Sequence, residues 1–105
     1  IMEEYEIIEL ENRLKISQEK LQNHLKNEKH IEWFDEFLIA IEICFNLYDE
    51  NKEEKYATIL EKLIQTMDDI IKNRFKNCSV EMKEIWQQLH LKTLTCLEKI
   101  KSNDI

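Results

Sequence analysis

The three histidines are the first residues to test for chemistry, because histidine is the commonest metal ligand and a frequent general base. They are His24, His30 and His90. A carboxylate-bridged metal site in a helical bundle needs a glutamate three residues before a histidine, so that both side chains share one helix face. Those positions hold Leu21, Asn27 and Gln87. Neither a Cys-x-x-Cys pair nor a His-Glu-x-x-His helix offers a zinc site instead. The sequence therefore predicts no metal and no cofactor.

Two other arrangements could carry chemistry, and both fall short. The acidic run from Asp49 resembles the start of a calcium-binding loop, but Glu54 stands where that loop needs glycine and Leu60 where it needs glutamate. His90 and Cys96 could pair as base and nucleophile, yet six residues apart they lie on different faces of one helix. A chain without glycine also has no phosphate-cradling loop. We expect no catalytic residue, no small-molecule substrate and no enzyme.

The elements that hold these residues are indicated by the complete absence of glycine and proline from the 105 residues. β-Hairpin turns rely on glycine, whereas helix interiors are destabilised by both residues. The length suits a single domain, residues 1–105. We predict an all-α fold, an antiparallel bundle of four helices joined by short loops.

Apolar periodicity predicts helices at about 2–29, 31–49, 52–76 and 80–102. The first carries a leucine seam at heptad spacing, in which Ser17 takes one position. Asn51 and Ser79 are predicted to be the N-caps of the third and fourth helices. No strong stop signal separates the first two, so the alternative is three helices with 2–29 and 31–49 continuous. We favour a turn, because the periodicity changes abruptly at Ile31.

The segment 31–49 is apolar over most of its circumference, which is typical of a helix buried on several sides. One face carries most of its aromatic side chains, and a separate face carries Ile39, Ile43 and Leu47. These faces can be core, or the surplus can bind a second protein. The side chains predicted to make that contact are Trp33, Phe37, Ile41 and Tyr48, followed by Leu14 and Leu21 of the first helix.

The net charge of −7 disfavours binding to nucleic acid or to an anionic membrane surface. No apolar run is long enough to span a bilayer. From Glu32 to Glu54 the chain has eight acids against Lys52 alone. This acidic segment can simply solvate a very apolar helix, or it can guide a basic segment of a partner.

Three cysteines, an odd number without Cys-x-x-Cys spacing, are typical of reduced thiols in a cytoplasmic or nuclear protein. These observations favour a non-enzymatic interaction or oligomerisation module of a larger intracellular scaffold. Its partner would be another protein, bound through helix packing in a homodimer or a hetero-oligomer. The alternative is a stand-alone small helical regulator, such as a pathogen effector that occupies a groove on a partner protein.

Overall fold

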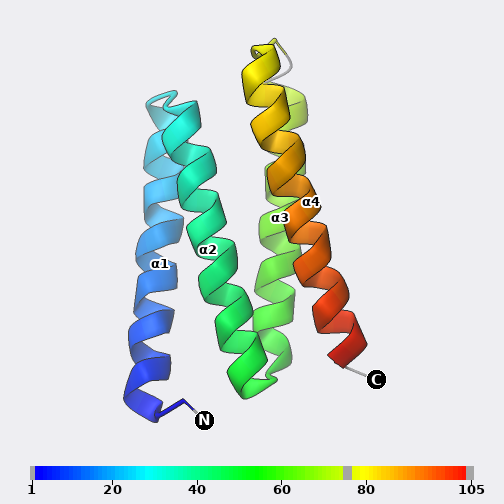
Figure 1. The fold of residues 1–105 in the computed structure, drawn as a ribbon. Helices are drawn as coiled ribbons and strands as arrows, with labels where there is room; N and C mark the ends of the chain where they lie inside the picture. Colours follow the sequence, from blue (N-terminus) through cyan, green and yellow to red (C-terminus); the bar gives the residue numbers. More distant parts are fainter. Residues whose placement is uncertain (1, 75–76, 104–105) are drawn as a thin grey trace.

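Four helices form the described part of the chain, residues 2–74 and 77–103 of a computed structural model. They are α1 (Glu4–Lys26), α2 (His30–Asn51), α3 (Glu54–Arg74) and α4 (Val80–Asn103). Each helix runs antiparallel to the preceding one, up and down along the long axis of the molecule (Figure 1). The predicted all-α, four-helix bundle is confirmed. Residues 75 and 76, which the sequence assigns to the third helix, lie outside the described residues.

The chain reverses between α1 and α2, so the alternative of one continuous helix is wrong. The Glu28 N–H donates to the Leu25 carbonyl at 3.2 Å, and the Lys29 N–H donates to the His24 carbonyl at 2.9 Å. This pair of bonds is the Schellman motif, which ends a helix at a residue with positive φ. Glu28 takes that position with φ 56° because the chain has no glycine to place there.

The other turns show one cap prediction failing and one succeeding. The predicted N-cap Asn51 is instead the last residue of α2. That helix ends at its C-cap, Lys52, which adopts φ 55°. The Lys52 N–H then donates to the Tyr48 carbonyl at 2.7 Å. Ser79 caps α4 as predicted, since its hydroxyl oxygen accepts the Met82 N–H at 3.3 Å.

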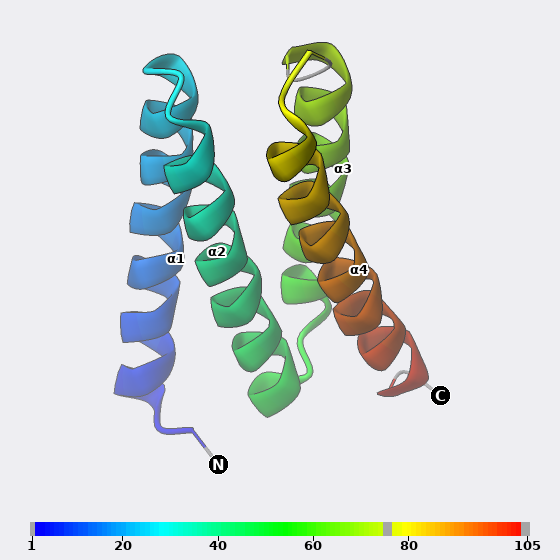
Figure 2. The same cartoon turned by 45° about the horizontal axis from the view of Figure 1, so that its top comes forward.

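The centre of the fold is α2, which packs against α1, α3 and α4. This arrangement confirms the prediction that the most apolar helix is buried on several sides. α3 and α4 also pack against each other, whereas α1 has its backbone close to α2 alone among the described helices. The chain thus forms two hairpins, α1–α2 and α3–α4, that meet along α2 (Figure 2).

Candidate functional site

The six residues predicted to contact a partner all lie in the interior of the folded chain. Each is at most 7% exposed and belongs to the hydrophobic core: Leu14, Leu21, Trp33, Phe37, Ile41 and Tyr48. The physical reason is the central position of α2, whose aromatic face is covered by the seams of α1 and α3. In this bundle the six side chains are part of the core, and their contact with a partner stays a prediction.

A hollow of about 210 Å³ between α1 and α3 is lined in part by three of these residues, Leu21, Trp33 and Phe37. The polar part of its lining is uncharged and consists of Gln18, Gln22 and Thr66. A hollow without charge carries no electrostatic signature of what would enter it. The predicted residues therefore contribute to the wall of a cavity, but this cavity does not define a partner.

The second apolar face of α2 is only partly buried. Ile43 and Leu47 are in the core, whereas Ile39 is 44% exposed. Ile43 and Leu47 lie on the side of α2 that faces α1. Ile39 lies further around the helix, toward solvent. Of the second apolar face that the sequence predicted on α2, Ile39 is thus the exposed member, and Ile31 in the first turn of α2 is exposed as well.

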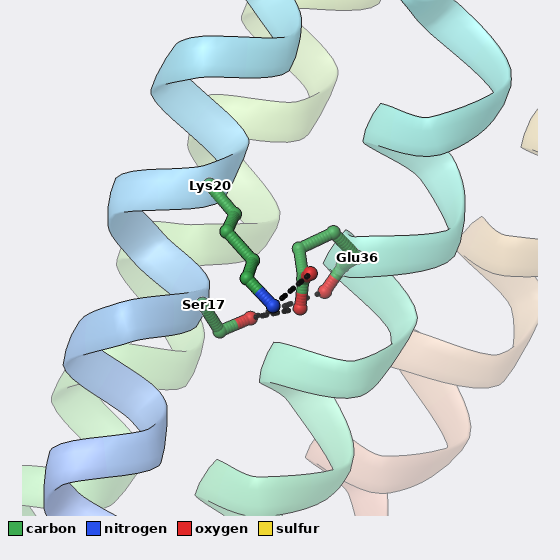
Figure 3. A network of polar contacts seen from close by, with 3 residues as sticks. All are labelled: Ser17, Lys20 and Glu36. Atoms are coloured by element: carbon green, nitrogen blue, oxygen red, sulfur yellow. Dashed lines mark hydrogen bonds and ion pairs between the residues drawn. The ribbon is translucent and has the colours of Figure 1, made fainter.

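A buried polar contact joins α1 to α2 beside this surface. The Ser17 hydroxyl donates to Glu36 Oε2 at 2.7 Å, and the Lys20 ammonium lies 3.9 Å from Glu36 Oε1 (Figure 3). The Glu36 side chain is 11% exposed, whereas that of Lys20 is 59% exposed. The hydroxyl is therefore the close, buried partner of the carboxylate, and the ammonium is a distant, solvated one.

The Ser17–Glu36 contact lies at the edge of a hollow of about 240 Å³ between α1 and α2. Its lining combines apolar and charged side chains: Arg13, Ile16, Ser17, Lys20, Glu36, Ile39 and Ile43. We call this the α1–α2 hollow. Ile16 and Ile39 stand exposed on its two sides. An apolar side chain entering the hollow would find hydrocarbon walls and charged groups within reach.

A second hollow of about 190 Å³ lies between α2 and α4, and we call it the α2–α4 hollow. Its walls are mostly apolar, with polar groups at the mouth: Phe34, Asp35, Leu38, Ile85, Gln88, Leu89 and Lys92. The Lys92 ammonium forms an ion pair with Glu42 at 2.8 Å. This pair bridges α4 to α2 at one end of the hollow.

The outward surface of α2 between the two hollows is acidic. Six exposed residues at helical spacing form a stripe along α2: Glu32, Asp35, Ile39, Glu42, Asn46 and Asp49. α2 contains no lysine or arginine. Lys92 from α4 offsets Glu42, and Lys52 offsets Asp49 at 3.3 Å. We call these six residues the acidic stripe. Glu36 belongs to the same acidic segment of the sequence, but its side chain is turned toward α1 and accepts the Ser17 hydroxyl.

A polar contact also ties α1 to α3. The Tyr56 hydroxyl donates to Glu11 Oε1 at 2.6 Å, and the Lys55 ammonium lies 3.6 Å from the same oxygen. Burial, together with the hydrogen bond to Glu11, raises the pKa of Tyr56 to about 12. This contact lies on the side of α1 opposite to the α1–α2 hollow, and it fixes the first helix onto the second hairpin.

Among the described side chains of reactive type, Cys44 and His90 have defined polar neighbours. The Cys44 thiol donates to the Tyr56 carbonyl at 3.1 Å, and burial raises its pKa to about 12, so it is not a thiolate at neutral pH. His90 Nδ1 lies 3.2 Å from Asp68 Oδ1, and the His90 ring packs on Trp86 with centroids 5.6 Å apart. Residues 2–74 and 77–103 contain no group of three histidine, cysteine or acidic side chains that could hold a metal ion.

No protein-family model, no curated protein and no solved structure matches this chain. Within the described ranges, none of the helices has the length and apolar character needed to cross a membrane. The features on which a function can be based are therefore the two hollows and the acidic stripe between them.

Proposed function

We propose that this chain is a non-enzymatic protein–protein interaction module that receives a basic amphipathic helix along α2 and α4. The observation that carries the proposal is the position of the acidic stripe directly beside the apolar α2–α4 hollow. A helix with apolar residues on one face and lysine or arginine on the other matches both parts of this surface. Apolar side chains enter the hollow, and basic side chains face the carboxylates.

The α2 wall of the hollow places a carboxylate next to an apolar side chain. Asp35 belongs to the acidic stripe and also lines the hollow, next to Leu38 on the same helix. Across the hollow, Ile85 of α4 is exposed enough to contact an incoming side chain. Apolar contacts in such a site contribute most of the affinity, whereas rim charges mainly set orientation, association rate and salt dependence.

A synthetic amphipathic peptide, with leucines on one helical face and lysines and arginines on the other, provides the test. Its binding is measured by fluorescence anisotropy at several salt concentrations. We expect Ile85→Asp to weaken binding at every salt concentration, because it places a charge on the apolar wall. We expect Asp35→Lys to weaken binding mainly at low salt, because it reverses a charge at the rim.

Matched controls distinguish binding at this surface from attraction by the net charge of the protein. Leu91→Asp adds a charge at an exposed apolar position elsewhere on α4, and Asp69→Lys makes the same charge change on α3. Both variants should bind the peptide like the original chain. Equal effects of Asp35→Lys and Asp69→Lys would refute the proposed surface, since attraction by net charge alone would then explain binding.

A further inference from the structure

The outward face of α1 carries apolar side chains that the described residues leave mostly exposed. Tyr5, Ile8 and Ile16 are 69%, 54% and 51% exposed. Together with Asn12 they follow one another at helical spacing on the side opposite to the leucine seam that packs on α2. α1 thus has two apolar faces, and the fold occupies one of them. A helix that keeps a second apolar face exposed is typical of an interaction surface.

The charges on this helix are divided between its two halves. The first half carries the acids Glu3, Glu4, Glu6, Glu9 and Glu11 and no basic residue before Arg13. Basic residues predominate in the second half, at Arg13, Lys15, Lys20 and Lys26. Two copies of such a helix repel each other when parallel and attract each other when antiparallel. The charge pattern is therefore complementary to itself under a two-fold rotation.

We propose that two copies of this chain associate through the outward faces of their α1 helices, antiparallel about a two-fold axis at Asn12. In this register Ile8 of one copy packs against Ile16 of the other. Glu9 of one copy then lies on the same flank as Arg13 of the other, two residues or about 3 Å apart along the helix axis, a distance that the long arginine side chain spans. Each such contact occurs twice in the dimer. Glu9 and Arg13 lie on the same flank of α1, four residues apart, as antiparallel pairing requires. The single asparagine at the axis favours this register over shifted ones.

The α1–α2 hollow explains why Tyr5 is exposed at the end of this face. In the same register Tyr5 of one copy reaches the level of Glu19 in the other copy, between Ile16 and Lys20, which both line the hollow. A tyrosine ring fits hydrocarbon walls, and its hydroxyl finds charged groups at the rim. The hollow of each copy would thus receive an aromatic anchor from the other copy, which is the usual form of a binding hot spot.

This dimer does not depend on the acidic stripe or on the peptide proposed for it, so the chain alone is measured. Sedimentation or light scattering over a concentration series, in reductant, should show a monomer–dimer equilibrium. Arg13→Glu should weaken the dimer by about tenfold, because two attractive contacts become repulsive. Glu9→Arg should do the same. The double variant Glu9→Arg/Arg13→Glu should restore the dimer, because both contacts return with their charges exchanged.

Lys62→Glu on α3 is the matched control for charge and should leave the dimer unchanged. Circular dichroism of each variant confirms that the monomer stays folded. A chain that remains monomeric at every concentration would overturn the proposal. So would a dimer that the single charge reversals leave unchanged, or one that the double variant fails to restore, because a contact with another surface or in another register would not respond to the exchange.

Disulfide crosslinking tests the antiparallel geometry independently, in a chain with Cys78 and Cys96 replaced by serine. Asn12→Cys lies at the two-fold axis and should form a covalent dimer on oxidation. Ile8→Cys alone should not, but it should crosslink when mixed with Ile16→Cys. Crosslinking of Ile8→Cys with itself would indicate parallel helices and would contradict the proposal.

Discussion

Replacing Ser17 by alanine removes one oxygen atom and is expected to destabilise the fold by about 1.5–3 kcal/mol. The hydroxyl donates to Glu36 Oε2 at 2.7 Å, and the Glu36 side chain is almost fully buried. Hydrogen bonds to charged groups contribute about 1.5–3 kcal/mol, and a buried carboxylate that loses its donor retains its desolvation penalty. Lys20 does not compensate, because its ammonium is 3.9 Å from the carboxylate and mostly in solvent. We expect Lys20→Ala to cost about 0.5 kcal/mol or less.

Urea unfolding followed by circular dichroism measures both changes, with the slope of the transition expected to stay the same. The total free energy of unfolding of a domain this size is about 5–15 kcal/mol, so the difference between the two variants is easily resolved. A double-mutant cycle isolates the contact. In a Glu36→Leu background Ser17→Ala should cost less than about 1 kcal/mol, because no buried carboxylate is left without a donor. The reasoning fails if Ser17→Ala costs the same in both backgrounds.

Three further predictions follow from the core, the first turn and the buried tyrosine. Phe37→Ala should lower the free energy of unfolding by about 3–5 kcal/mol, because Phe37 is buried. Leu91→Ala, at an exposed position, should change it by under about 0.5 kcal/mol. Urea titrations that give equal effects for the two variants would contradict the burial of Phe37. Glu28→Gly should raise the stability by about 0.5–1 kcal/mol, because glycine adopts φ 56° without strain; a lower melting temperature would contradict this. The stability should also fall as the pH rises from 10 to 12, because unfolded Tyr56 loses its proton near 10 and folded Tyr56 holds it until about 12. Burial of Cys44 also makes the stability fall with rising pH, beginning near pH 9. The contribution of Tyr56 is therefore measured as the difference between the stability–pH profiles of the original chain and of Tyr56→Phe.

The fold was predictable because the apolar periodicity and the lack of glycine and proline all favour helix. The turn between α1 and α2 was less certain, since the residue that ends α1 is Glu28, which carries none of the usual signals of a helix end. The N-cap at Asn51 was predicted wrongly for a related reason. Asparagine is a good cap in general, but here Lys52 takes the left-handed conformation one residue later, and α2 extends through Asn51.

The exposed surface could not be predicted from the sequence, because a helical pattern shows which residues share a face but not which neighbour covers it. The sequence groups Glu36 with Glu32 and Asp35 in one acidic segment, yet the position of α1 buries it against Ser17. One signal was present: a serine in the leucine seam of the first helix marks a place where a polar partner is needed. Its partner could be identified only after the packing of the two helices was known.

The one-sided packing of α1 also has a consequence for how the fold opens. Because its backbone approaches α2 alone, α1 can separate while α2, α3 and α4 keep their mutual contacts. Its amide protons should then exchange with solvent through a partial opening, at lower free energy than those of α2, whose exchange requires unfolding of the whole bundle. The Ser17–Glu36 and Tyr56–Glu11 hydrogen bonds must both break in this event. We therefore expect the first helix to behave as a separate cooperative unit attached to a three-helix core.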